Sequence, residues 1–517
     1  MVIIPDLRAT IGRIELAAQA LAPDTLPPGK LASQLGATVG DPDLANLAAG
    51  AVLIAIGPGG AAPSTAVIIP TTDTAAYVAA AKHLGQQAEA VGALVVVGSK
   101  PADVALGKRL AQQHAALSAA PLRGDLRLLI APQRIVAAYQ PVLAGLSTMM
   151  TAQLAKQPKG ELTAKIVGLE IAGLLAALED VEGCQIDVGI DGTTISIDNT
   201  VQAKADGLLA QALVKPPAAT GPLLAKRMGL DPGYMVMIGT YHAPGVCAWV
   251  AGLLDTVRQQ PTGKDLIDDA TLALVREWGK TADGGFAMRL RAVGEHLMRM
   301  DGANGARDGA RLQGLQKRLF DMLFVTGPAA ALYREMGIGM TYTENARTSG
   351  STPVARVAYT IDETQMPAEQ AAQVRNFMQD IELANLPTAS LFANDPADLD
   401  RMVAGAQHAL PTTAERTIGA DRDGYMDLDW LALIKVSMRA NAEQMPGMAD
   451  VFAKLPPSAP LTGAWIARDG RLLWESRIPL KPFFDFGKAM QEAMRQGFKN
   501  NDDAPPPPAP ENNEQMF

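Results

Sequence analysis

Alternating apolar and polar residues, interrupted by turn residues, predict antiparallel β-hairpins along the chain. The clearest pattern is CQIDVGIDGTTISIDNT, in which the Asp-Gly pair at 191–192 fits a two-residue type I′ turn, because both central residues of that turn need positive φ. With this turn, Val188 is expected opposite Ile195, and Ile186 opposite Ile197. The apolar side chains then share one face of the hairpin, as a half-buried antiparallel pair requires.

A second Asp-Gly pair, at 469–470, lies in LTGAWIARDGRLLWESRIP. The same turn places Ala467 opposite Leu472 and Trp465 opposite Trp474. Two tryptophans directly across an antiparallel pair make a favourable aromatic contact. The sequence therefore predicts a cross-strand tryptophan pair near the end of the chain.

Two hairpins with longer loops are also expected. The strands AVLIAI and TAVIIP flank the loop Gly57–Ser64, and GMTYTEN and VARVAYTI flank the loop Ala346–Pro353. The glycine-rich loop Ile56–Gly60 is the segment most similar to a phosphate-binding loop, but in a dinucleotide-binding fold such glycines open a helix. Here a second strand follows, so a hairpin loop explains them better.

Three strands end in Ile-Pro and lead into an amphipathic helix, at Ile4-Pro5, Ile69-Pro70 and Ile478-Pro479. Proline ends a strand ladder because it has no N–H, and it is tolerated in the first turn of a helix. Asp6 and Asp73 are the expected N-caps of the first two helices. The shared position of the three pairs indicates a degenerate repeated module.

Apolar residues at helical spacing predict helices between the hairpins, including Gln133–Lys156 and Glu161–Leu178. The fold class is therefore expected to be α+β, with antiparallel hairpins and curved sheets covered by helices. The expected domains are an N-terminal α+β module, a central hairpin and helical module, a C-terminal α+β module and a disordered proline-rich tail, with the boundaries 1–157, 158–330, 331–499 and 500–517.

The charge and the hydropathy of the chain restrict which binding partners and which cellular location are expected. The net charge of −9 and the lack of a basic stripe argue against nucleic-acid binding. No apolar run reaches the length of a membrane helix, so no transmembrane segment is expected. The chain opens directly on the strand-like VIIP with no signal-peptide pattern, which favours a mature exported protein, periplasmic or secreted, whose leader has been removed; the alternative is a cytoplasmic protein.

The two cysteines, Cys184 and Cys247, cannot form a disulfide framework or a four-ligand zinc site. Both lie in strand-like patterns, which favours buried and inert thiols. A single bridge between them is the alternative, and it would indicate an oxidising compartment.

Candidate chemistry is sparse, and no catalytic, cofactor-binding or metal-binding residue is predicted. The five histidines are scattered, there is no GxSxG motif, and the acidic run Asp421–Asp429 fails the EF-hand pattern at both ends. The segment Tyr234–Trp249 holds the richest mix of reactive groups, including His242, and is interpreted as strand, loop and strand.

The pattern as a whole resembles uncharacterised exported bacterial proteins built from repeated hairpin–helix modules. The residues that carry the resemblance are IIPTTDTAAYVAAA, the hairpin at 191–192 and the closing strand and helix at Ile478–Met494. A more remote likeness is to lipoprotein-carrier folds, in which helices cover a curved antiparallel sheet. These resemblances imply a cell-envelope or secreted protein and assign no activity.

Two functions remain as hypotheses. The first is a non-enzymatic binding or scaffold protein that offers apolar concave sheet surfaces, rich in Ile, Val and Met, to a lipid-like or peptide ligand. The second is a hydrolase whose site is assembled from distant residues around His242 or Asp421–Asp429.

Overall fold

The computed structural model of the chain describes residues 1–502 with short gaps. The gaps are 23–26, 39–40, 42–43, 59–62, 120, 157–159, 218–219, 230–232, 261–262, 265, 294–295, 327–329, 331–332, 335–336, 363, 365–378, 406–411 and 441–447. The proline-rich tail expected at 500–517 lies outside the described residues from 503 onward.

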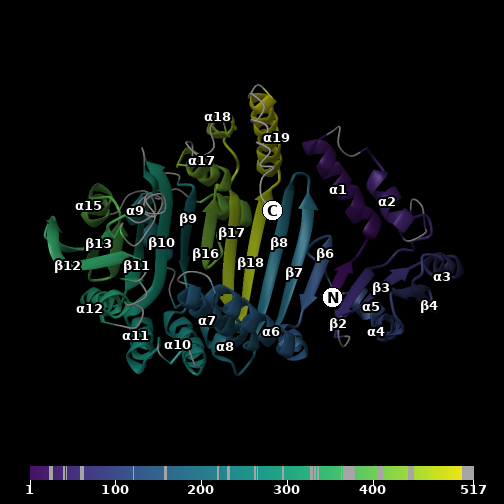
Figure 1. Cartoon of the computed structure of the whole chain (residues 1–517), viewed down its shortest axis with the longest axis horizontal. Helices are drawn as coiled ribbons and strands as arrows, with labels where there is room; N and C mark the ends of the chain where they lie inside the picture. Colours follow the sequence, from purple (N-terminus) through teal and green to yellow (C-terminus); the bar gives the residue numbers. More distant parts are fainter. Residues whose placement is uncertain are drawn as a thin grey trace, which may run out of the picture.

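The described strands form a single open antiparallel sheet of 18 strands, which confirms the α+β class (Figure 1). The first eight strands are β1 (Val2–Ile4), β2 (Val52–Gly57), β3 (Ser64–Pro70), β4 (Gln87–Val91), β5 (Leu94–Gly98), β6 (Leu126–Ile130), β7 (Val181–Asp191) and β8 (Thr194–Ala203). The others are β9 (Met235–Thr240), β10 (Ala282–Val293), β11 (His296–Ala306), β12 (Ile338–Ser349), β13 (Thr352–Ile361), β14 (Ile381–Leu386), β15 (Ala389–Ala393), β16 (Gly424–Leu428), β17 (Leu461–Arg468) and β18 (Arg471–Pro479).

The order of the strands across the sheet differs from their order in the chain. From one edge to the other it is β4–β5–β3–β2–β1–β6–β7–β8–β18–β17–β16–β9–β10–β11–β15–β14–β13–β12. Close to the middle of the sheet, β8 pairs with β18, although these two strands lie far apart in the sequence. Because the sheet runs through all three expected modules, the boundaries at 157, 330 and 499 remain predictions.

The helices connect these strands and pack on both faces of the sheet. They are α1 (Leu7–Leu21), α2 (Lys30–Thr38), α3 (Thr74–His83), α4 (Pro101–Ala111), α5 (His114–Ala119), α6 (Pro132–Ala155), α7 (Gly160–Glu179), α8 (Leu208–Ala212), α9 (Gly221–Met228), α10 (Ala243–Arg258), α11 (Asp269–Thr281), α12 (Gly309–Phe320) with the π-helical turn η2 (Asp321–Thr326), α15 (Pro396–Ala404), α16 (Thr413–Ile418), α17 (Trp430–Ala440), α18 (Met448–Ala453) and α19 (Lys481–Asp502). In Figure 1, α1, α17, α18 and α19 lie at one end of the central strands, and α6, α7, α8 and α10 lie at the other.

Capping explains where several helices begin. The carboxylates of Asp6 and Asp73 accept hydrogen bonds from the backbone N–H groups of Ala9 and Ala76, each at 2.9 Å. Both predicted N-caps are confirmed. A side-chain oxygen at this position satisfies one of the N–H groups that the first helical turn leaves without a partner.

The hairpin at 469–470 has the predicted register, with Trp465 paired to Trp474 and Ala467 to Leu472. The register predicted for the other Asp-Gly hairpin is wrong: Val188 pairs with Ile197, so the turn residues are Gly192 and Thr193. A shift of two residues leaves every side chain on its predicted face. Burial therefore does not discriminate between the two registers. A type I′ turn at 191–192 needs positive φ at both residues, but only Gly192 has it, at 55°, and Asp191 instead pairs with Thr194 in the ladder.

Both hairpins with longer loops are present, as β2–β3 and β12–β13. The second has a shorter loop than expected, because β12 continues to Ser349 and β13 begins at Thr352. The segment Tyr234–Trp249 is wrong as strand, loop and strand: it contains β9 followed by helix α10, and Cys247 is helical.

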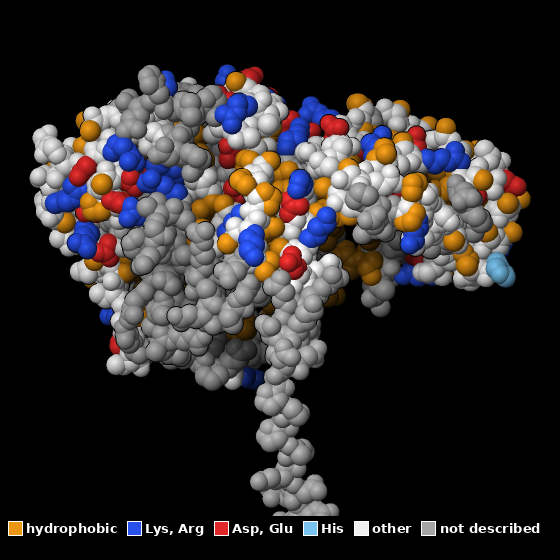
Figure 2. Space-filling view, turned by 90° about the horizontal axis from the view of Figure 1, so that it is seen from above, with side chains coloured by type: hydrophobic (Ala, Val, Ile, Leu, Met, Phe, Trp, Pro, Cys, Tyr) orange, Lys and Arg blue, Asp and Glu red, His pale blue; other side chains and the backbone are white. Residues whose placement is uncertain are grey.

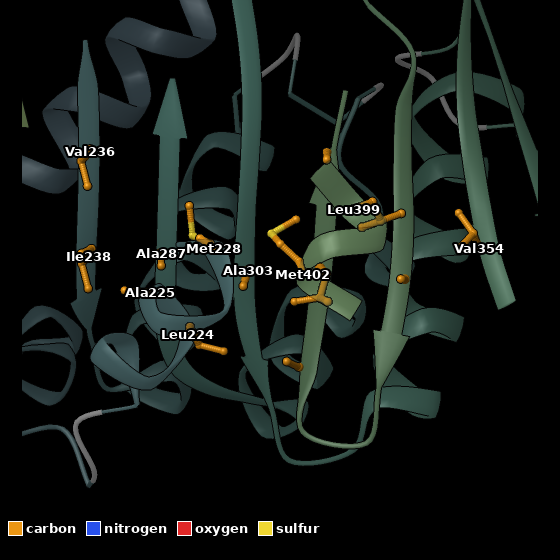
Figure 3. Close-up of a cluster of buried hydrophobic side chains, with 14 residues drawn as sticks. Leu224, Ala225, Met228, Val236, Ile238, Ala287, Ala303, Val354, Leu399 and Met402 are labelled. Carbon is orange, nitrogen blue, oxygen red and sulfur yellow. The ribbon is translucent and has the colours of Figure 1, made fainter. Parts of the chain in front are cut away.

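The largest apolar core lies on one face of the sheet, toward the β12 edge. Val236, Ile238 and Ala287 contribute from β9 and β10, and helices α9 and α15 cover them with Met228 and Met402 (Figure 3). Near the other edge both faces are covered, by α1 and α3 on one side and by α4 on the other. Buried apolar clusters thus cover both faces of the sheet more completely near its edges than in its middle.

Candidate functional site

The central strands carry a continuous surface of partly exposed apolar side chains, which we call the apolar face. Cross-strand pairing places these side chains on the same side of β7, β8, β18, β17, β16, β9, β10 and β11. Its members are Ile186, Val188, Ile190, Ile195, Ile197, Trp474, Trp465, Met426, Met235, Met237, Phe286, Met288, Leu290 and Met300. Figure 2 shows hydrophobic side chains gathered in a shaded recess near the middle of the molecule.

Strand β9 shows how the two sides of the sheet differ. Val236 and Ile238 point into the core and are 7% and 6% exposed. Their neighbours Met235 and Met237 point to the apolar face and are only half-buried. The apolar side chains on one side of β9 are therefore buried, whereas those on the other side remain partly accessible to solvent.

A row of aromatic rings crosses the apolar face. The ring of Trp465 stacks on Trp474, with centroids 5.4 Å apart and planes within 3°, and on Phe286, at 6.0 Å and within 8°. Gly424 and Gly239 lie beneath the Trp465 ring, and a Cβ at either position would come closer to the ring than 3.0 Å. The two glycines thus allow the indole to lie flat across two strands.

On the opposite side of the sheet, polar side chains gather over the strands around β8 and β18. An open groove of about 1020 Å³, which we call the polar groove, lies over β6, β7, β8, β17 and β18. Four arginines and three aspartates line it, together with glutamines and a threonine. The charged lining residues are Arg123, Arg127, Arg468, Arg471, Asp187, Asp198 and Asp469.

A buried ion pair lies at the floor of the polar groove. Arg127 and Asp187 face each other across β6 and β7, and their exposed fractions are 7% and 3%. Arg127 donates from Nε to Oδ1 of Asp187 at 2.6 Å and from Nη2 to Oδ2 at 2.8 Å. The side chain of Gln185 donates to the same carboxylate at 3.0 Å, so the acid is fully engaged.

The sequence contains a signal for this groove. In CQIDVGID the polar residues Gln185 and Asp187 alternate with apolar ones, and in TISIDNTVQ the polar positions Asp198 and Thr200 do the same. This alternation assigns each side chain to one of the two faces of its strand. Only the neighbouring strands show that these polar faces adjoin arginines from β17 and β18.

The structure gives His242 a local structural role. It is the N-cap of α10, and its Nδ1 accepts a hydrogen bond from the backbone N–H of Gly245 at 3.2 Å. His242 lies in the short connection between β9 and α10, as expected for a loop residue.

Three of the four acids of Asp421–Asp429 likewise accept hydrogen bonds from the backbone. Asp423 accepts from the N–H of Ala467, Asp427 from the N–H groups of Thr413 and Ala414, and Asp429 from that of Ala432. These bonds fix a hairpin and the starts of two helices. Carboxylates that are already satisfied in this way are poor candidates for acid–base chemistry.

Both thiols are free, and burial raises the pKa of each. Cys184 lies in β7 as expected, whereas Cys247 lies in α10. Within the described ranges, no three His, Cys, Asp or Glu side chains are grouped so that they could hold a metal ion.

Among the helices that the structure describes, α6 is long and apolar enough to cross a membrane, judged by length and composition. Its apolar residues Ile135, Val142, Leu146 and Met149 are exposed. The expected lack of a transmembrane segment stays a prediction.

Comparisons with protein families, with curated proteins and with solved structures found no match to this chain.

Proposed function

We propose that the protein is a non-enzymatic binding protein whose apolar face accommodates the acyl chain of a lipid-like ligand. The observation that carries the proposal is the row of partly exposed apolar side chains along eight central strands, which on β9 alternate with the buried Val236 and Ile238. Flexible methionines suit such a surface, because thioether side chains adapt to ligands of different shape.

An acyl chain fits the apolar face better than a peptide does. The backbone N–H and C=O groups of the central strands are engaged in the ladders of the sheet. A peptide lying across this surface would lose water from its own backbone groups without gaining partners, which is costly. An acyl chain has no such groups, and each methylene group that it buries contributes about 0.8 kcal/mol.

A brominated fatty acid tests this proposal directly, because bromine quenches tryptophan fluorescence only at short range. Trp465 and Trp474 lie on the apolar face, whereas the other three tryptophans, Trp249, Trp278 and Trp430, lie on helices α10, α11 and α17. We expect saturable quenching that disappears in the variant Trp465→Phe/Trp474→Phe. Quenching that persists unchanged in this variant would place the ligand elsewhere and refute the proposal.

Substitutions on the apolar face provide the matched comparison. Met237→Asp places a carboxylate among Met288, Met426 and the bound chain, so affinity should fall by at least about tenfold, equivalent to about 1.4 kcal/mol. Met149→Asp changes the same residue type at an exposed position on α6 and should leave the affinity unchanged. As part of this function, we also propose that the fold is related to that of lipoprotein carriers and that the protein is exported.

We also propose that the sheet consists of two related halves, β1–β8 and β9–β18, with the hairpin β12–β13 added to the second. In support, β1 pairs with β2 and β6 as β9 pairs with β10 and β16, and β3 pairs with β5 as β11 pairs with β15. Matched registers also align the helix caps Asp73 and Asp308. This repeat is larger than the Ile-Pro module, whose three junctions follow β1, β3 and β18.

The correspondence extends to one hydrogen-bond arrangement. The N–H of Asp125 donates to the carbonyl of Val188, and its carboxylate accepts from the N–H of Ile190, both at 2.7 Å. Asp423 makes the same two bonds, at 2.8 and 2.7 Å, with Trp465 and Ala467. We expect Asp125→Ala and Asp423→Ala to lower the free energy of unfolding by similar amounts, about 1–3 kcal/mol each. A loss in only one of the two variants would contradict the correspondence.

A further inference from the structure

We propose that the polar groove binds a small oxyanionic ligand, a carboxylate or phosphate carried on a polar molecule. The proposal concerns the side of the sheet opposite the apolar face and is independent of the function proposed above. It rests on guanidinium groups with unused donors, on the size of the groove, and on a comparison of the two halves of the chain.

Two arginines of the groove retain donors for a ligand. Within the described residues, the side chain of Arg123 makes no hydrogen bond or ion pair, and that of Arg471 donates only from Nε to Gln202. A guanidinium group matches the geometry of a carboxylate or phosphate and binds it through paired N–H donors.

The acids of the groove do not cancel this charge. Asp187 is paired with Arg127, and Asp198 accepts from Arg477 at 2.9 Å. Asp469 is the remaining acid of the lining, and it is exposed at the tip of the hairpin turn. The two arginines therefore outnumber it, in a protein whose net charge is −9.

The neutral lining indicates a polar molecule around the anionic group. Gln185, Thr200 and Gln202 offer donors and acceptors along β7 and β8. A groove of about 1020 Å³ is large enough for a metabolite-sized molecule, since small-molecule sites span roughly 300–1000 Å³. A sugar acid or a sugar phosphate has the required combination of hydroxyl and oxyanion groups.

The buried pair Arg127–Asp187 is not a requirement of the fold. In the matched position of the second half, aligned through Asp125 and Asp423, the cross-strand pair is Tyr425 and Ala464. There the two residues pack with Ala414 of α16 in an apolar cluster. Replacing a buried ion pair by packed apolar residues is often neutral or stabilising. The charged pair is therefore better explained by the groove than by stability.

Binding is measured by isothermal titration with the full chain at constant ionic strength. The probes are glucose 6-phosphate and glucuronate, with inorganic phosphate and glucose as the two partial ligands. We expect a saturable 1:1 complex with at least one of the two sugar anions and none with glucose. Binding of inorganic phosphate with equal affinity would show that the anion alone is recognised. No saturable binding of any anion overturns the proposal.

Variants locate the complex. Arg471→Gln and Arg123→Gln should each weaken it by about tenfold or more, as expected for loss of one charge-assisted hydrogen bond. Arg311→Gln removes an exposed arginine that pairs with Glu277 far from the groove, and should leave the affinity unchanged. Equal weakening in all three would indicate general charge screening and overturn the site.

The double variant Arg127→Tyr/Asp187→Ala copies the second half into the first. It should retain the circular dichroism spectrum of the folded protein and lose the anion, because the floor of the groove becomes apolar. Undiminished binding in this folded variant overturns the role of the pair in the site. If the double variant does not fold, Gln202→Leu tests the same groove, since it removes the acceptor that orients Arg471.

Discussion

The flat ring of Trp465 depends on a missing side chain beneath it, and Gly424→Ala perturbs it with a single methyl group. The new Cβ would lie closer than 3.0 Å to the Cζ2 atom of the indole. This Cβ would project from the backbone of β16, which is held in place by its pairing with β17. The indole ring therefore has to tilt away from the sheet.

The expected cost follows from the contacts that the ring then loses. Trp465 stacks on Trp474 and on Phe286, with centroids 5.4 and 6.0 Å away. Each aromatic pair contributes about 0.5–1.5 kcal/mol, so Gly424→Ala should lower the free energy of unfolding by about 1–3 kcal/mol. Gly145→Ala is the matched control: nothing lies within 4 Å of its new methyl group in α6, and the change should stabilise by about 0.5–1 kcal/mol.

Two measurements check the reasoning. Denaturant unfolding gives the change in stability, and far-ultraviolet circular dichroism reports the exciton coupling of two stacked indoles directly. We expect the coupling to be strong in the wild type and in Gly145→Ala, and reduced in Gly424→Ala. Unchanged coupling in Gly424→Ala, with no loss of stability, would refute the arrangement of rings on the apolar face.

Three further outcomes follow from the side chains around the sheet. Burial raises the pKa of Tyr241 to about 12, and because the folded value exceeds the unfolded value of about 10, this tyrosine stabilises the protein below pH 10 and that contribution is lost as the pH rises toward 12. Alkaline unfolding should therefore shift to higher pH in Tyr241→Phe, and an identical midpoint would contradict this. Burial also raises the pKa of Cys247, so iodoacetamide should modify it only after unfolding, and rapid labelling of the native protein would show that the thiol is accessible. Asp73→Ala removes the cap of α3 and should cost about 1 kcal/mol in thermal or denaturant unfolding, whereas Asp73→Asn keeps a capping oxygen and should cost less.

The sequence alone determined local features of the fold: turns, the faces of strands and the starts of helices. The two-residue turn at 469–470 defined the pairing of Trp465 with Trp474, and side-chain alternation assigned the faces of each hairpin. Asp6 and Asp73 indicated where two helices begin. These features depend on residues within a few positions of each other, so a single sequence contains the information.

Misleading local signals account for the errors. Ala-Pro-Gly after His242 is typical of a loop, but here Pro244 lies in the first turn of α10, where its missing N–H costs nothing. Gly245 is needed because a Cβ would meet the carbonyl of Gln211, so the glycine serves close packing against the end of α8.

The order of the strands was decided by tertiary structure alone. Nothing near β1 in the sequence indicates that it lies between β2 and β6, and nothing near β8 indicates that it pairs with β18, more than 250 residues later. Such pairings depend on how whole layers of helices and strands bury their apolar surfaces together. That order joins the methionines and tryptophans of separate hairpins into one apolar face. On the reverse side it joins Arg127 and Asp187 with Arg471, and so forms a groove that no single segment contains.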